Sequence, residues 1–393
     1  MGERERGLGA WSGRKRYHAR STAVHCPLGG IMTNHVLHAS VSGTLARSAA
    51  ALLFAIGGVL VGGTALAADA PAGYHLVHTY KIAEAGGFWD YMSVDSDAHR
   101  LYISRGNHVA VMDTRTGKIV GDIPGGHVIH GIALAPRLGR GFVSDGTSPA
   151  AVIVFDLKNL KVLQVVKVPA NGSDCIVYDP VSKRVFTFNG ASGSATAIDA
   201  ASGRVIGSID LGGRPEFAVA DGRGHLYNNL EDKSEELEID TATLRITHRW
   251  SLAPCESPSG LAIDAAHRRL FVGCHNLKMA VVNADSGKVV TTLPIGAGVD
   301  ANRYDPGTGL AFSSNGQAAT LTVVREESPD QFTKLGDVTT EPAARTMAID
   351  LKTHDVFLAT ANMGPRPTVA TAQNPRRFPR MTPGTFRILE YAR

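Results

Sequence analysis

The sequence lacks the short motifs by which many enzymes and cofactor carriers are recognised. It contains no Gly-x-Ser-x-Gly nucleophile turn, no His-Glu-x-x-His metal pair and no phosphate-binding loop. Its four cysteines form no Cys-x-x-Cys-His run, which excludes covalent attachment of haem. No apolar stripe with helical spacing follows Ala68, so helix is expected to be nearly absent.

The chain carries almost no net charge once its N-terminal segment is set aside. Of 40 Lys/Arg and 36 Asp/Glu residues, seven and two lie in residues 1–67, which leaves 33 basic and 34 acidic residues. The formal charge of +4 is therefore a property of the leading segment. No basic surface for nucleic acid is predicted.

Residues 1–67 are predicted to be a leader, and residues 68–393 a single domain. Ala49–Ala67 has no charged residue, Arg47 precedes it, and it ends in a small-x-small pattern that signal peptidase reads. A cleaved secretory signal is expected, which predicts a periplasmic or secreted protein. A retained membrane anchor is the alternative, because about 20 apolar residues can span a bilayer. The depth of the signal in the chain suggests Met32 as the true start.

Three cysteines lie beyond the leader, which contains Cys26. In an oxidising compartment Cys255 and Cys274 can pair, because the two loops that carry them are expected to open on one face. Cys175 would then be left over.

A unit of four short strands recurs seven times. Each unit has an apolar strand, a strand with a central aromatic residue, an apolar strand ending in Asp or Asn, and a turn that often reads Thr/Ser-Gly-Lys. The first strands end at Asp95, Ala135, Asp179, Ala220, Asp264, Asp305 and Asp350. The aromatic residues are Tyr102, Phe142, Phe186, Tyr227, Phe271, Phe312 and Phe357. This period predicts an all-β, seven-bladed β-propeller with four-stranded antiparallel blades.

The last unit supplies only three strands, Thr346–Asp350, Val356–Thr360 and Phe386–Tyr391. The strand-like run Tyr74–Ile82 precedes the first unit. We expect this run to complete the last blade, so that the ring has no open edge.

The second and third strands of the clearest units resemble the repeat of YVTN-family (YncE-like) β-propellers. The similarity rests on Arg100–Ser104 with Val109–Lys118, on Lys183–Phe188 with Ala195–Arg204, and on Arg269–Gly273 with Ala280–Lys288. It implies a seven-bladed propeller that is usually exported and has no reaction shared across the family. Related propellers serve as lactonases, dehydrogenase heavy chains and binding modules. The chain departs from the name-giving tetrapeptide, with Tyr-Ile-Ser, Phe-Val-Ser and Phe-Val-Gly in its place.

Polar residues recur where the first strand of each blade enters the central channel. The predicted ring contains Asp90, Tyr91, His130, Asp174, Glu216, Asp300 and Arg345. Loops after the second strands are expected to add polar residues on the same face, namely Asn107, His108, Asp145, Asn189, Asn229, His275 and Asn315. The predicted ligand-binding set combines the ring with Asn107 and His275.

Three interpretations of this ring stay open. It can be a small-ligand site, a divalent-cation site, or a channel mouth that is polar only because it is wet. Carboxylates and amide carbonyls suit Ca²⁺ or Mg²⁺, and histidine would admit Zn²⁺ or Mn²⁺. Asp174, Asp300 and His130 are the predicted metal ligands, with His275 as a further histidine candidate; no cofactor is required.

The leading functional prediction is an exported monomer that binds a small molecule or a protein at the channel face without catalysis. One alternative is a lactonase-type or other hydrolase that uses a cation in the acidic ring. Another is a propeller subunit of a periplasmic redox complex.

Two further segments are singled out. Residues 363–384 form a Pro- and Arg-rich insertion in the last unit, predicted to be a lid, a basic docking arm or a flexible tether. Residues 231–236 form an acidic run, predicted to be a solvated loop of blade four.

Overall fold

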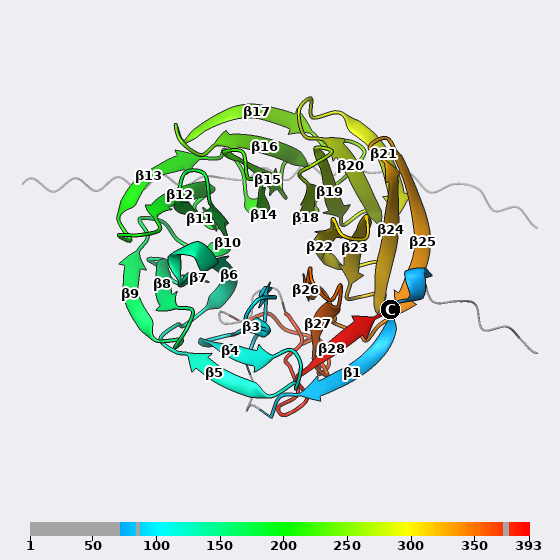
Figure 1. Cartoon of the computed structure of the whole chain (residues 1–393), viewed down its shortest axis with the longest axis horizontal. Coiled ribbons are helices and arrows are strands. Elements are labelled where there is room, and N and C mark those ends of the chain that lie inside the picture. Colours follow the sequence, from blue (N-terminus) through cyan, green and yellow to red (C-terminus); the bar gives the residue numbers. More distant parts are fainter. Residues whose placement is uncertain (1–70, 84–86, 372–376) are drawn as a thin grey trace, which may run out of the picture. The chain divides into compact units, whose positions relative to one another are not determined.

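The computed structural model describes residues 71–83, 87–371 and 377–393, and shows seven four-stranded antiparallel sheets arranged as blades around a ring (Figure 1). This confirms the predicted fold class. The predicted leader lies outside the described residues. Within those residues, no helix has the length and apolar character needed to cross a membrane.

The blades are numbered in chain order, each from its innermost to its outermost strand. Blade one consists of β2 (Met92–Asp95), β3 (Arg100–Arg105), β4 (His108–Asp113) and β5 (Ile119–Ile123). Blade two consists of β6 (Ile129–Ala135), β7 (Arg140–Asp145), β8 (Ala151–Asp156) and β9 (Val162–Lys167). Blade three consists of β10 (Ser173–Asp179), β11 (Arg184–Asn189), β12 (Ser194–Asp199) and β13 (Val205–Asp210). Blade four consists of β14 (Pro215–Ala220), β15 (His225–Leu230), β16 (Glu235–Asp240) and β17 (Arg245–Ser251).

The remaining blades follow the same plan. Blade five consists of β18 (Pro258–Asp264), β19 (Arg269–Cys274), β20 (Lys278–Asn283) and β21 (Val289–Pro294). Blade six consists of β22 (Val299–Asp305), β23 (Leu310–Asn315), β24 (Thr320–Ser328) and β25 (Gln331–Thr339). Blade seven consists of β26 (Thr346–Ile349), β27 (Val356–Thr360), β28 (Arg387–Ala392) and β1 (His75–Lys81). Two short 3₁₀ turns, η1 (Pro71–Gly73) and η2 (Pro136–Leu138), are the helical elements of the described part.

The N-terminal strand closes the ring, as predicted. Strand β1 pairs antiparallel with β28, from His75 opposite Ala392 to Lys81 opposite Arg387. The join is packed as well as hydrogen-bonded, because Tyr74 is fully buried and its ring meets that of Phe312 at 5.2 Å. Blade seven therefore has its fourth strand, and the ring leaves no blade incomplete.

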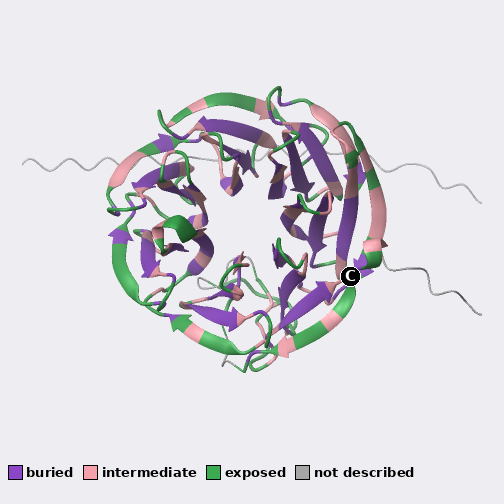
Figure 2. Ribbon diagram, viewed as in Figure 1, coloured by how far each residue is buried: buried purple, intermediate pink, exposed green. Residues whose placement is uncertain are grey.

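The core lies between successive blades, and among the strands the outermost ones carry most of the exposed residues (Figure 2). Every predicted second-strand aromatic is buried, with at most 1% of its surface exposed. Burying one such side chain stabilises the fold by about 1.5–3 kcal/mol. The repeated aromatic position is thus the main apolar contact between blades.

The repeated turn after the third strand is shaped by its Asp and its Gly. Asp113 Oδ1 accepts hydrogen bonds from the backbone of Arg115 and Thr116, and Gly117 follows with φ of +67°. A Cβ on Gly117 would lie 1.9 Å from the ring of Tyr80 on the neighbouring blade. Glycine is required there both by its positive φ and by this close approach.

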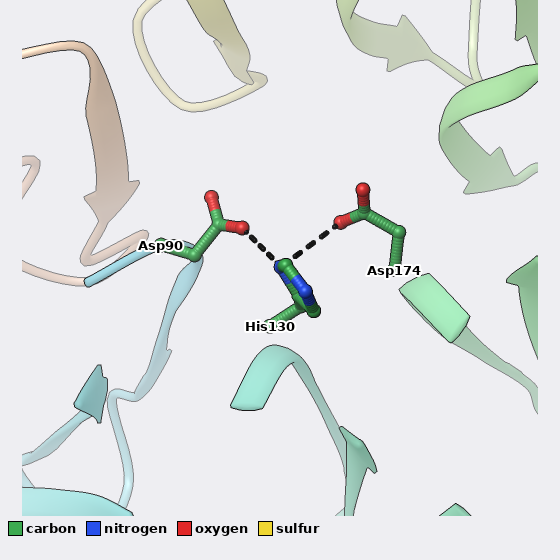
Figure 3. Close-up of side chains that lie close together, drawn as sticks. All are labelled: Asp90, His130 and Asp174. Carbon is green, nitrogen blue, oxygen red and sulfur yellow. Dashed lines mark hydrogen bonds and ion pairs between the residues drawn. The ribbon is translucent and has the colours of Figure 1, made fainter. Parts of the chain in front are cut away.

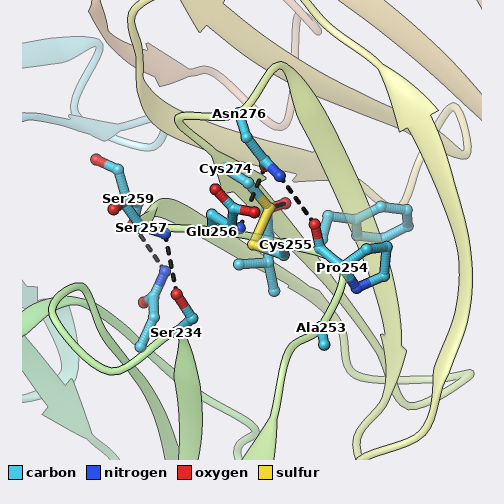
Figure 4. Close-up of a disulfide and its surroundings, with 12 residues drawn as sticks. Ser234, Ala253, Pro254, Cys255, Glu256, Ser257, Ser259, Cys274 and Asn276 are labelled. Carbon is cyan, nitrogen blue, oxygen red and sulfur yellow. Dashed lines mark hydrogen bonds between the residues drawn. A yellow bond between two sulfur atoms is a disulfide. The ribbon is translucent and has the colours of Figure 1, made fainter. Parts of the chain in front are cut away.

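Cys255 and Cys274 form a disulfide, with their Cα atoms 5.5 Å apart (Figure 4). It ties the loop before β18 to the end of β19. Cys175 is a free, buried thiol.

The prediction of a solvated acidic loop is wrong for its last two residues. Glu235 and Glu236 begin β16, where Glu236 lies opposite Asn229 and Trp250 and is fully buried. The alternation of a strand places Glu236 on the blade face, and composition alone gave no sign of this.

Candidate functional site

The residues predicted to ring the channel enter it at irregularities in the innermost strands. Strand pairing shifts register at His130 in β6, Asp174 in β10, Glu216 in β14, Ser259 in β18 and Asp300 in β22. A bulge leaves its residue unpaired and redirects its side chain. The ring is therefore built by a backbone feature that recurs in five blades.

His130 connects three blades at this mouth (Figure 3). Its Nδ1 lies 2.6 Å from Asp90 Oδ2 in a hydrogen bond and 3.6 Å from Asp174 Oδ1. Asp90 precedes β2, and its own backbone N–H donates to Ser104 Oγ. The two carboxylates approach the imidazole from the blades on either side of it.

Two arginines neutralise part of the remaining acidic charge. Arg345 Nε lies 2.8 Å from Asp300 Oδ2, and its Nη2 lies 3.9 Å from Asp90 Oδ1. Arg214 lies 2.9 Å from Glu231 and 3.6 Å from Glu216. Five carboxylates thus meet two guanidinium groups and one imidazole, so the mouth is acidic overall.

Two carboxylates are left without a hydrogen bond. Asp174 Oδ1 and Glu216 Oε2 are buried and have no hydrogen-bond partner among the described residues. Each oxygen lies 3.6 Å from a basic group, His130 Nδ1 and Arg214 Nη2 respectively, which is too long for a hydrogen bond, so the loss of water on burial is only partly compensated. The mouth therefore favours a positively charged group at this point.

Burial and the close spacing of charged groups shift the pKa values of three residues at the mouth. Burial raises the pKa of Asp174 to about 7, with His130 opposing the shift and Asp90 adding to it. Burial also raises the pKa of Glu216 well above its usual range, and the charge of Asp174 reinforces it. For His130, burial alone would lower the pKa, but the hydrogen bond to Asp90 and the charge of Asp174 outweigh it and raise the pKa to about 9.

Asp300 has a different environment from the other acids. Burial raises its pKa, whereas the adjacent Arg345 lowers it. Ser259 Oγ also lies 3.4 Å from Asp300 Oδ1. Asp300 is therefore compensated inside the mouth, unlike Asp174.

Aromatic side chains border the acidic cluster. Phe88, 43% exposed, meets the His130 ring edge-on at 5.6 Å. The Arg345 guanidinium lies 5.6 Å from the centre of the Trp89 ring and 6.0 Å from that of Phe88. Tyr91, also in the predicted ring, donates its hydroxyl to the Glu216 carbonyl at 3.4 Å.

The group of potential metal ligands differs from the predicted set. Asp90, His130 and Asp174 offer ligand atoms within 4.8 Å of one another. The sequence suggested Asp300 in place of Asp90. Asp300 instead engages Arg345, because the side chains of blades six and seven meet at that point.

The second-strand loop residues are not all at the mouth. Asn189 and Asn315 are the last residues of β11 and β23, and Asn229 is next to last in β15; all three are fully buried within blades. Their hydrogen bonds go to side chains and backbone of the blades, which corrects the expectation that they line the face. Asn107 bonds to His108 at 2.9 Å. His275 lies close enough to Asp300 to lower its pKa.

Reasoning from the repeat missed three contributors to the mouth. Phe88, Arg214 and Glu231 lie outside the aligned strand positions, so no periodic signal marked them. Arg214 and Phe88 each precede a ring acid by two residues, and this spacing is the only sequence signal we find for them.

The Pro- and Arg-rich insertion starts and ends beside the mouth. Ala361 and Phe386, at its two ends, are buried with Trp89 in one apolar cluster. Within it, Met363 and Met381 form an isolated antiparallel bridge. Residues 372–376 lie outside the described part of the chain.

Comparisons with known proteins leave the family open. No family model matches the chain, and no curated protein matches it. Among solved structures, hydrazine synthase of Kuenenia stuttgartiensis is 15% identical with a TM-score of 0.60, over 71% of this chain and 93% of that one. U3-55K is 9% identical with a TM-score of 0.63, over 79% and 97% of the two chains. The RRP9 WD40 repeats are 9% identical with a TM-score of 0.63, over 82% and 99%.

These similarities show the fold alone. A propeller fold is consistent with binding of a ligand or a protein, and the choice between these depends on the site itself.

Proposed function

We propose that this propeller binds a small molecule with a positively charged group at its channel mouth and catalyses no reaction there. The observation that carries the proposal is the pair of buried, unpartnered oxygens, Asp174 Oδ1 and Glu216 Oε2. An ammonium or amidinium group placed between them would supply both missing hydrogen bonds and the missing charge. Arg345 is engaged with Asp300, and Arg214 lies closer to Glu231, at 2.9 Å, than to Glu216, at 3.6 Å.

Phe88 adds a second element of recognition. An exposed aromatic ring beside an acidic cluster suits a ligand that carries a cation next to an apolar group. A cation over such a ring gains roughly 0.5–1 kcal/mol at an exposed site. The proposed ligand is therefore a small organic cation with an apolar portion.

Three benzyl compounds of similar shape test this proposal. Benzylamine is expected to bind in the presence of EDTA, as measured by saturation-transfer NMR and calorimetry, whereas benzyl alcohol and benzoate are not. Asp174→Asn combined with Glu216→Gln should weaken benzylamine binding about tenfold, which corresponds to ~1.4 kcal/mol. Asp156→Asn, in a turn far from the mouth, is the matched control. Equal binding of benzoate, or no effect of the double substitution, would overturn the proposal.

A divalent cation is the second candidate occupant. Asp90, His130 and Asp174 fit one, because a histidine nitrogen and two carboxylates can approach a common point. Such an ion would polarise a carbonyl oxygen, which is the chemistry that a lactonase-type hydrolase needs. Metal analysis of the purified protein distinguishes the candidates. A stoichiometric metal that Asp90→Asn removes would favour the hydrolase.

We also infer that the protein is exported and is related to the YVTN-type propellers. The uncharged run before Ala68 supports export, and a disulfide is typical of oxidising compartments. N-terminal sequencing of periplasmic material should begin near Ala68, and intact chain in the membrane pellet would favour the anchor. The redox-subunit alternative gains nothing from the hydrazine synthase match, because 15% identity carries fold only.

A further inference from the structure

A second cluster of ligand-type side chains lies where blades five and six meet, away from the channel mouth. Asp264 ends β18, His267 follows in the next turn, and Glu326 comes from β24 of blade six. His267 Nδ1 lies 2.7 Å from Asp264 Oδ2 and 3.1 Å from Glu326 Oε1. Asp264 is separated from Ser259, which contacts the mouth, by most of the length of β18. The second cluster therefore lies at the end of β18 that is farther from the mouth.

Both carboxylates of this cluster are deeply buried. The side chains of Asp264 and Glu326 are 3% and 2% exposed, whereas that of His267 is 50% exposed. Glu326 Oε2 is buried and has no hydrogen-bond partner among the described residues. The Tyr304 hydroxyl also donates to Asp264 Oδ2, at 3.4 Å, but of these two donors only the imidazole can carry positive charge.

The neighbouring arginines do not supply that charge. Arg268 pairs with Asp221 and Asp285, and Arg269 pairs with Asp330. His267 is thus the basic group of the described structure that pairs with either acid. A buried pair of carboxylates with so little compensation is unfavourable unless a cation joins them or one of them takes up a proton.

Glu326 is an exception within the repeat. In six blades, the same backbone hydrogen bond links the third strand to the second. Its donor is the N–H of the first residue after the stretch that pairs with the second strand, and its acceptor is the carbonyl of the residue just before the second strand. The other five residues at this position are Thr114, Leu157, Ala200, Thr241 and Ala284. Glu326 makes the same bond to Gly309, although it still lies within the longer strand β24, opposite Phe332 of β25. Alanine occupies this position in blades three and five, so the shared backbone bond does not require an acid.

The next blade junction offers an internal comparison. His354 Nδ1 lies 2.9 Å from Asp305 Oδ2, which also accepts a hydrogen bond from Thr308. Among the described residues, no second carboxylate forms an ion pair with His354. The blade five–six junction differs from it by the added Glu326.

We propose that Asp264, His267 and Glu326 bind a divalent transition-metal ion, Zn²⁺ or Mn²⁺, which joins blades five and six. The three residues offer ligand atoms within 4.8 Å of one another, as a common ion requires. One histidine nitrogen and two carboxylate oxygens suit these ions better than Ca²⁺, which prefers six or more oxygens. The half-exposed side of His267 leaves access for water at the remaining position.

Metal titration of the chelator-stripped protein tests the site. Zn²⁺ uptake is followed by calorimetry, and Co²⁺ uptake by its visible absorption bands. Wild type is expected to bind at this site and to unfold at a higher temperature with Zn²⁺, because a ligand that binds only the folded state stabilises it. Glu326→Ala, which restores the residue of blades three and five, should lose one equivalent of metal and the rise in melting temperature.

Matched variants separate this site from the rest of the molecule. His354→Ala removes the comparison histidine and should keep the metal, and Asp174→Asn should keep it as well, since it alters only the mouth. If Glu326→Ala fails to fold, His267→Gln serves instead, because that side chain is half exposed. Unchanged metal uptake in a folded Glu326→Ala or His267→Gln protein, or no uptake by wild type, overturns the proposal.

Discussion

The two ends of strand β10 carry aspartates with opposite roles. At its outer end, Asp179 is fully buried and its carboxylate accepts hydrogen bonds from the backbone of Val181 and Ser182 and from the Ser182 hydroxyl. At the mouth, Asp174 has a buried oxygen without a hydrogen bond. Residues that repeat around the ring satisfy the backbone of their own blade. Residues that differ between blades face one another across the channel, and there the chain tolerates unmet polar groups.

Removing the strand that closes the ring should have the largest effect. Deletion of residues 74–82 removes β1 and leaves β28 with an unpaired edge, together with the loss of the buried Tyr74. Cooperative thermal unfolding is expected to disappear, as measured by calorimetry. A truncated protein with an unchanged melting temperature would contradict the closure.

Substituting each of the two β10 aspartates tests directly whether they have different roles in stability. Asp179→Ala is expected to lower the free energy of unfolding by about 1–3 kcal/mol, because it leaves buried backbone donors unpaired. Asp174→Asn at pH 8 should leave stability unchanged or raise it by up to about 1 kcal/mol, since it removes a buried charge that His130 compensates only in part. Urea denaturation measures both. Similar losses in the two variants would show that the mouth acid also serves the fold.

The pH dependence of stability should come from the mouth. The pKa of Asp174 is about 7 in the folded protein against an ordinary value of 3.8, so the folded state holds more protons between these values. Stability from this group is full below pH 4 and is lost as the pH rises toward 7. His130, with a pKa of about 9 against 6.5, adds a loss between pH 6.5 and 9.

Denaturation of wild type and Asp174→Asn across pH 4–9 measures this effect. The Asn variant should lose the share of the decline below pH 7 that Asp174 contributes, which we expect to be on the order of 1–2 kcal/mol, and should keep the share that comes from the raised pKa of Glu216. A wild-type profile without this decline would refute the assignment of the raised pKa.

The smallest effect on stability is expected at Phe88. Phe88→Ala removes a side chain that is 43% exposed, so the free energy of unfolding should change by less than about 0.5 kcal/mol. Benzylamine binding should nevertheless weaken by roughly 0.5–1 kcal/mol, as measured by calorimetry. A change in stability without a change in binding would place Phe88 with the structural residues.

The sequence by itself determined the ring of seven blades, its closing strand and its turns. These features follow from a period of apolar strands, buried aromatics such as Phe142 and turn aspartates such as Asp113, each of which acts within one blade or on its neighbour. Local patterns of this kind can be read along the chain because every blade must satisfy the same backbone and bury the same face.

Only the tertiary structure decided which polar residues meet. The bulges at His130 and Asp174 direct their side chains to partners about 40 residues away, and a strand pattern carries no signal of that direction. For the same reason the sequence placed Asn189 on the channel face, although it is buried in its blade, and it did not predict that Glu326 lies beside Asp264. Contacts across blades depend on where the closed ring places each strand end, which no local pattern in the chain encodes.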